Sequence, residues 1–196
     1  MSAQPQPYLT PEEYLAIERK AEFKSEYFQG EMFAMSGASL AHNQIVANLM
    51  IGIGSQLQKR SCRIFNADMR VEAKSNDAYY YPDVVALCGE PKLKDHHQDI
   101  LLNPMVLIEV LSPSTESYDR GLKRETYAQL ESLRDYVLVA QDRMHVEHLA
   151  LQEDRRWVLT DLYLPEETLV LESVQAELTL AEIYDNVEFP ELQETA

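Results

Sequence analysis

The stretch that decides the fold is residues 104–111, Pro-Met-Val-Leu-Ile-Glu-Val-Leu. Short apolar runs rich in branched side chains are typical of strands buried on both faces of a sheet. One acid, Glu109, interrupts this run. Because an ionised carboxylate costs several kcal/mol to bury unless it is paired or binds a metal, we expect Glu109 to have a partner.

A second predicted strand, residues 79–87, carries another acid, Asp83. If the two strands are neighbours, their carboxylates repel each other, and one stays protonated at neutral pH unless a cation lies between them. Oxygen ligands suit Mg²⁺ or Mn²⁺, which can polarise a phosphoryl oxygen and lower the pKa of an attacking water. The alternative is a solvated acid at Asp83 and an ion-paired Glu109.

A helix is predicted over residues 118–133, directly after the first strand. Asp119, Lys123 and Tyr127 follow at four-residue spacing, so they share one helix face. Because this helix starts where the Glu109 strand ends, its first turns can lie over the two acids. The Lys123 ammonium could then orient an attacking water or neutralise charge in the transition state. The alternative is a surface ion pair between Asp119 and Lys123.

The remaining periodicity predicts a mixed α/β (α+β) chain, with a central mixed sheet flanked by helices. Further helices are predicted over residues 10–21, 39–57 and 180–184. Strands are predicted in a hairpin at 24–36, and at 63–73, 136–140, 144–151 and 157–162. Residues 89–103 are expected to form an exposed loop, and residues 164–178 to be irregular. The unit from Val106 to Val139 should be a right-handed parallel crossover.

The chain length suits one domain. Of the 196 residues, we expect 10–187 to form it, between a disordered N-terminal arm at 1–9 and a frayed tail at 188–196. No run of about eighteen apolar residues occurs, so no membrane span is predicted.

Charge and cysteine content bear on partners and compartment. The net charge of −16 counts against a non-specific DNA binder, which usually shows a basic surface. Cys62 and Cys88 fit neither a disulfide framework nor a zinc site with paired ligands. We interpret them as small buried hydrophobes of a protein in the reducing cytoplasm.

The acids and the lysine lie in blocks that resemble a known family. Pro82-Asp83 followed by Glu109-Val-Leu is similar to the core of the PD-(D/E)XK nuclease superfamily. More closely, several blocks resemble the Uma-two family of restriction endonucleases over about residues 10–185. They are Tyr-Pro-Asp-Val-Val at 81–85, Ile-Glu-Val-Leu-Ser-Pro-Ser-Thr at 108–115, Asp-Arg-Gly-Leu-Lys at 119–123 with Tyr127, and the hairpin at 26–31.

This resemblance implies a restriction-endonuclease-like core that hydrolyses the phosphodiester bonds of DNA with the help of a divalent metal ion. A homodimer would suit double-strand cleavage. The superfamily's lysine, expected two residues after the strand acid, is replaced by Leu111 here. The resemblance assigns its role to Lys123. By analogy, Asp83, Glu109 and the backbone carbonyl of Val110 would hold Mg²⁺ or Mn²⁺.

Four further residues are secondary candidates for the site: Glu26, His42, Asp119 and Tyr127. Glu26 reads either as an additional acid near the metal or as a solvated hairpin residue. His42 lies in the first turn of its helix, where a lone histidine is more often structural than catalytic.

Two other functions stay open. The net charge and the missing in-strand lysine are also compatible with a catalytically inactive interaction module on the same fold. A two-carboxylate hydrolase that needs no metal, such as a glycosidase, is a weaker alternative.

Overall fold

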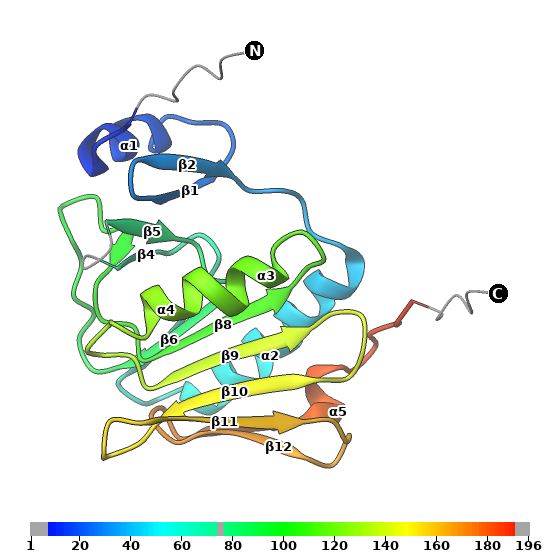
Figure 1. Cartoon of the computed structure of the whole chain (residues 1–196). Coiled ribbons are helices and arrows are strands. Elements are labelled where there is room, and N and C mark those ends of the chain that lie inside the picture. Colours follow the sequence, from blue (N-terminus) through cyan, green and yellow to red (C-terminus); the bar gives the residue numbers. More distant parts are fainter. Residues whose placement is uncertain (1–7, 74–76, 191–196) are drawn as a thin grey trace.

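The computed structural model describes residues 8–73 and 77–190 (Figure 1). The expected arm at 1–9 and tail at 188–196 therefore fall mostly outside the described residues. In the part that is described, no helix is long and apolar enough to cross a membrane.

The core is a six-stranded sheet in the order β11-β10-β9-β8-β6-β3. Its strands are β3 (Cys62–Asn66), β6 (Val84–Cys88), β8 (Val106–Leu111), β9 (Asp135–Ala140), β10 (Val146–Leu151) and β11 (Trp157–Leu162). The predicted apolar strand forms β8, whose residues are all buried. β8 and β9 run parallel, as predicted for the 106–139 unit, and the other neighbours pair antiparallel.

One face of this sheet is covered by α2 (Leu40–Leu57), which lies behind the sheet in Figure 1. Ser39 caps the helix by accepting a hydrogen bond from the backbone N–H of His42. The predicted apolar stripe is buried against the sheet and consists of Ile45, Leu49, Ile53 and Leu57. At Gly52 an added Cβ would lie 2.3 Å from the Leu178 side chain. The glycine therefore allows α2 to pack closely against the segment that contains Leu178.

The opposite face is covered by the crossover between β8 and β9 (Figure 1). A single α-helix over 118–133 was predicted, but the segment is shorter and irregular. It consists of α3 (Glu116–Tyr118), the π-helical turn η2 (Asp119–Lys123) and α4 (Arg124–Tyr127). The helix ends early because the chain turns back to bury Leu133 just before β9, where the Arg134 N–H donates to the Met105 carbonyl ahead of β8.

A second sheet, of order β2-β1-β5-β4-β7, lies beside the crossover. It contains β1 (Ser25–Phe28), β2 (Glu31–Ala34), β4 (Arg70–Ala73), β5 (Ala78–Tyr80) and β7 (Ile100–Leu101). The predicted 24–36 hairpin is confirmed as β1–β2, and α1 (Pro11–Glu18) packs on it. The predicted 63–73 strand is wrong, because a turn divides it into β3 and β4 in two different sheets. The 89–103 segment is also not simply exposed, since Ile100 and Leu101 are fully buried.

The 164–178 segment is not irregular as predicted. It contains the hairpin of β12 (Thr168–Leu171) and β13 (Ala176–Thr179), in which every second residue is buried. The predicted closing helix is α5 (Leu180–Ile183), capped by Thr179.

The interpretation of the two cysteines is also wrong. Cys62 and Cys88 form a disulfide, and both are only half-buried. The antiparallel register of β3 and β6 places the two residues directly opposite each other. No local pattern reveals that register, because the two strands are separated by β4 and β5 in the chain.

Candidate active site

The centre of the candidate site is the ammonium group of Lys123, on the turn η2. Its Nζ lies 2.9 Å from Oε1 of Glu26, 3.2 Å from Oε1 of Glu109 and 3.2 Å from Oδ1 of Asp119. These three acids come from β1, β8 and η2. All four side chains are at least nine-tenths buried, with exposed fractions of 3–9%. One cation is thus enclosed by three carboxylates.

Asp83 lies beside this cluster, directly before β6. The β6–β8 register pairs Val84 with Ile108, so the next position sets Asp83 opposite Glu109. Its Oδ2 accepts a hydrogen bond of 2.7 Å from the backbone N–H of Val110, and its Oδ1 lies 3.1 Å from Nε2 of His42. The carboxylate is therefore held in place from β8 and from α2.

Tyrosine side chains enclose the cluster. The Tyr127 hydroxyl donates to Oε1 of Glu109 at 3.0 Å, and the Tyr136 hydroxyl donates to the Asp119 carbonyl at 3.0 Å. The rings of Tyr80 and Tyr118 lie 5.5 and 5.8 Å from Nζ of Lys123. At these distances the ring faces attract the ammonium.

Burial and charge act in opposite directions on the protonation of the cluster. Burial, and then the carboxylates of Asp119, Asp83 and Glu26, raise the pKa of Glu109 well above its usual range, although the Lys123 ammonium opposes this. Burial favours neutral Lys123, but the three carboxylates outweigh it and raise the pKa of Lys123 well above its usual range. Lys123 therefore stays charged, and Glu109 readily takes up a proton.

The donor set of this site suits a hard divalent cation. Asp83 and Glu109 offer carboxylate oxygens from adjacent positions, directly before β6 and on β8, and among the described residues Oδ1 of Asp119 is buried with no partner besides the Lys123 ammonium. Four carboxyl groups lie around a single ammonium here, so an added cation would be favoured electrostatically. Mg²⁺ and Mn²⁺ prefer such oxygen ligands.

A different set of residues was missed by the sequence analysis. Within the described residues, one group of three side chains offers metal-binding atoms within 4.8 Å of one another: His145, Glu147 and Asp161. The alternation of His145 and Glu147 along one strand was a signal for a shared face. Their proximity to Asp161 depends on the β10–β11 register, which the sequence does not display.

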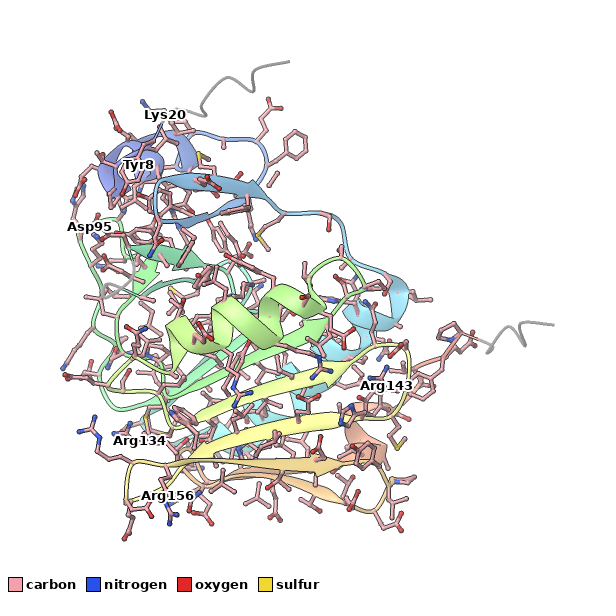
Figure 2. All side chains as sticks on the ribbon, in the orientation of Figure 1. Tyr8, Lys20, Asp95, Arg134, Arg143 and Arg156 are labelled. Atoms are coloured by element: carbon pink, nitrogen blue, oxygen red, sulfur yellow. A yellow bond between two sulfur atoms is a disulfide. The ribbon has the colours of Figure 1, made fainter. Side chains whose placement is uncertain are left out.

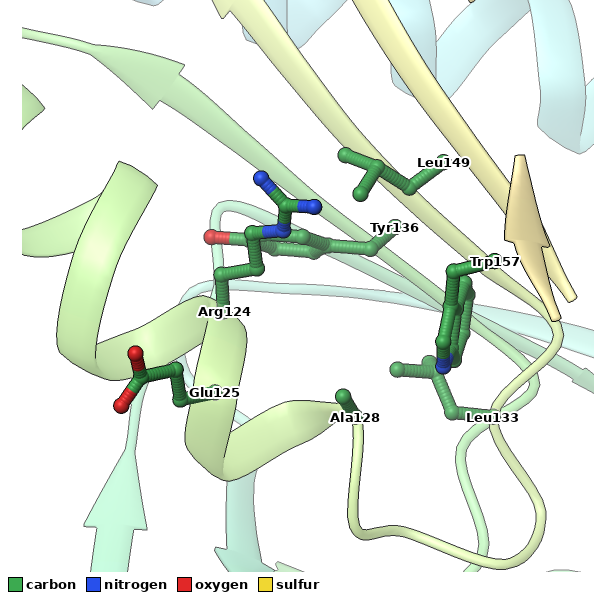
Figure 3. A pocket seen from close by; sticks show the side chains of 7 residues that line it. All are labelled: Arg124, Glu125, Ala128, Leu133, Tyr136, Leu149 and Trp157. Atoms are coloured by element: carbon green, nitrogen blue, oxygen red, sulfur yellow. The ribbon is translucent and has the colours of Figure 1, made fainter. Parts of the chain in front are cut away.

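A pocket of about 160 Å³ lies between α4 and the sheet (Figure 3). Arg124 and Trp157 project into it from opposite sides, over Tyr136, Leu133 and Leu149. Lys123 and the acids around it do not line this pocket, although Tyr136, whose hydroxyl bonds the Asp119 carbonyl, does. The chemistry of the acids, rather than the size of a cavity, therefore marks the candidate site.

The sequence of the chain is similar to a known protein family. The model of the Uma2 family, described as "Putative restriction endonuclease", matches residues 11–182. The chain belongs to the Uma2 family. The Synechocystis sp. protein sll1609 is 38% identical over 154 residues, which cover 79% of this chain and 87% of that protein. The Synechocystis sp. protein slr1290 is 35% identical over 185 residues, which cover 94% of this chain and 96% of that protein.

A solved structure shares the fold of this Uma2 chain. The crystal structure of a "putative nuclease belonging to DUF820" from Anabaena variabilis superposes with a TM-score of 0.73 at 19% identity. The match covers 90% of this chain and 97% of that one. Together with the mixed sheet, it confirms the expected restriction-endonuclease-like fold.

All the predicted site residues of this Uma2 chain lie in one connected network. Asp83, Glu109 and Lys123 are linked through Val110 and the salt bridge described above. The secondary candidates also join it, namely Glu26, His42, Asp119 and Tyr127. Their catalytic and metal-binding roles stay predictions. Tyr80, Tyr118 and Tyr136 were missed, because a tyrosine in a strand or helix that packs on the sheet is usually interpreted as part of the core.

Proposed function

We propose that this Uma2 protein is a Mg²⁺- or Mn²⁺-dependent endonuclease that hydrolyses phosphodiester bonds of DNA. The family and the shared fold support a nuclease. The proposal rests mainly on the contact between Nζ of Lys123 and the carboxylate of Glu109. Glu109 occupies the position on β8 that lies opposite Asp83.

The proposed metal ligands are the carboxylates of Asp83 and Glu109, with the Val110 carbonyl as a third contact. When bound there, a divalent cation would polarise a phosphoryl oxygen and lower the pKa of the attacking water. His42 orients Asp83, and Tyr127 orients Glu109. Both are positioning residues in this proposal.

Lys123 would supply the fixed positive charge of the reaction. Its raised pKa keeps it an ammonium ion at neutral pH. Glu26 makes the shortest of its three contacts, at 2.9 Å, and so determines where the ammonium lies. A charge held in this way can stabilise the negative charge that develops on the phosphoryl oxygens, without reorganisation during the reaction.

The acidic surface requires a counterpart to bind DNA. The net charge is −16, and Figure 2 places Arg143 at one end of the sheet and Arg134 and Arg156 at the other, so these cations do not form one basic face. We infer that a bound divalent metal would offset the acidity at the site. A second copy of the chain in a homodimer would suit double-strand cleavage, but it adds its own charge of −16 and does not offset the acidity.

The test is nicking of supercoiled plasmid DNA by the full chain with Mg²⁺ or Mn²⁺. We expect Glu109→Gln and Asp83→Asn to abolish nicking, and Lys123→Met to lower its rate about 10²- to 10³-fold, the usual effect of losing one preorganised charge donor. Glu153→Gln, at an exposed acid, is the matched control and should cleave at the wild-type rate. Undiminished nicking by Glu109→Gln would show that these acids are not the active site.

One observation favours the alternative, a non-catalytic interaction module. Both carboxylate oxygens of Asp83 already have partners, and Glu109 is already paired with Lys123. In that case the cluster is a structural ion-pair network. Calorimetry separates the two functions, because the module would show no Mn²⁺ binding that depends on Asp83.

A further inference from the structure

A second group of possible ligands lies at the other side of the crossover. His145 directly precedes β10, Glu147 lies on β10, and Asp161 lies on β11 opposite Glu147. Nε2 of His145 lies 2.8 Å from Oδ1 of Asp161 and 3.9 Å from Oε1 of Glu147. The spacing of two residues places His145 and Glu147 on the same face of the strand. Three potential ligands therefore converge on one point.

The imidazole of His145 is held in a fixed orientation. Its ring stacks on Tyr163, with centroids 4.6 Å apart and planes inclined by 2°. Its backbone N–H donates to the hydroxyl of Tyr184 at 3.1 Å. The side chain of His145 is 10% exposed, whereas that of Asp161 is 38% exposed. A preformed nitrogen ligand thus faces an acid that solvent can reach.

Negative charge is in excess at this point. Arg120, on the turn η2, pairs with Glu147 and, at 2.8 Å, with Glu116. One guanidinium therefore serves two carboxylates, while Asp161 is paired with the histidine alone among the described contacts. A cation placed among the three ligands would be attracted, and it would compete with Arg120 for Glu147.

We propose that His145, Glu147 and Asp161 form a second metal site, which binds Zn²⁺ or a similar transition-metal ion in preference to Mg²⁺. One imidazole nitrogen and two carboxylates are ligands that Zn²⁺ accepts, with water completing the shell. Mg²⁺ instead prefers oxygen ligands alone. The site therefore differs in metal preference from the oxygen-only set around Asp83.

The second site is separate from the candidate active site but lies on the same sheet face. Glu109 pairs in register with Leu138, and Leu138 pairs with Glu147. Two strand spacings, about 10 Å, thus separate Glu109 from Glu147. The turn η2 spans this distance, because Asp119 and Lys123 reach Glu109 while Arg120 reaches Glu147. The proposal does not depend on nuclease activity.

The test is titration of the metal-free full chain with Co²⁺, followed by visible absorption, and with Zn²⁺, followed by calorimetry. We expect His145→Ala and Asp161→Asn each to weaken binding at least about tenfold, since even indirect partners of metal ligands are worth about 10- to 100-fold in affinity. Glu153→Gln, at an exposed acid that belongs to neither site, should leave this binding unchanged.

Arg120→Gln gives a prediction of opposite sign. Removing the competing guanidinium should tighten Zn²⁺ binding about two- to fivefold, the range expected for a partly exposed ion pair. Unchanged Zn²⁺ affinity in Asp161→Asn, whose side chain is partly exposed and whose loss should not unfold the chain, would overturn the proposal. Loss of Co²⁺ binding in Glu109→Gln but not in His145→Ala would also overturn it, as would equal competition by Mg²⁺.

Discussion

Replacing Lys123 by methionine removes the one cation from a buried group of three carboxylates. Nζ lies within 3.2 Å of an oxygen of each acid, and methionine retains most of the side-chain volume. A buried carboxylate that loses its partner takes up a proton rather than remain charged. The cost of Lys123→Met is therefore set by protonation of a carboxyl group, and it must depend on pH.

The magnitude follows from the ordinary pKa of a glutamate, 4.5. To keep such a group protonated at pH 7 costs about 3.4 kcal/mol per carboxyl relative to the unfolded chain, and at pH 5 only about 0.8 kcal/mol, from 1.36 kcal/mol per pKa unit. The folded variant binds more protons than its unfolded chain above pH 4.5, so its stability falls as the pH rises. At pH 7 the loss should lie near the usual 3–5 kcal/mol for a broken buried ion pair.

The assay is urea unfolding of wild type and Lys123→Met at pH 7 and pH 5, with Lys20→Met at an exposed lysine as the control (Figure 2). Adding Glu109→Gln to the variant should restore part of the stability at pH 7, because one carboxyl no longer needs a proton. A loss below about 1 kcal/mol at pH 7, or equal losses at both pH values, would refute the reasoning.

Three further predictions concern stability. Burial raises the pKa of Tyr127 and Tyr136 well above their usual range. The free energy of unfolding should therefore fall as the pH rises past about 10, where tyrosines of the unfolded chain ionise. Tyrosinate absorbance should then appear together with loss of the circular dichroism signal. By the loop-entropy model, Cys62→Ser should lower the free energy of unfolding in urea by about 3.5 kcal/mol, and dithiothreitol should lower that of the wild type by a similar amount. No change in either measurement would contradict the Cys62–Cys88 bond. Partial burial raises the pKa of Asp99, but its paired arginines outweigh this and lower it. The stability that the Asp99 carboxylate contributes should therefore be lost on acidification below about pH 4. In Asp99→Asn, the free energy of unfolding should fall less steeply over this acidic range.

Local periodicity was sufficient to predict the helices and strands that carry a strong apolar pattern. The strand at 104–111, the stripe from Ile45 to Leu57 and the parallel crossover could be predicted because each follows from residues close in the chain. Within the site, the four-residue spacing of Asp119 and Lys123 was likewise visible.

Contacts that depend on register or on distant segments could not be predicted. Glu26 reaches Lys123 from a hairpin almost a hundred residues earlier in the chain. The Cys62–Cys88 bond and the pairing of Glu147 with Asp161 both depend on which residues of two strands lie opposite each other. Single-strand patterns do not contain that information.

The π-helical turn η2 has a consequence for how this site could vary. A π turn holds one residue more than the α-helical turn it replaces. Deleting one residue between Asp119 and Lys123 would convert this turn to regular α-helix and leave the two residues three positions apart, a spacing that keeps them on one helix face. The segments on either side would then keep nearly the same relative orientation. A chain with one residue fewer in this turn could therefore present the same ammonium and carboxylate to the strand acid, so the lysine of such a site need not lie at a fixed distance from that acid in the sequence.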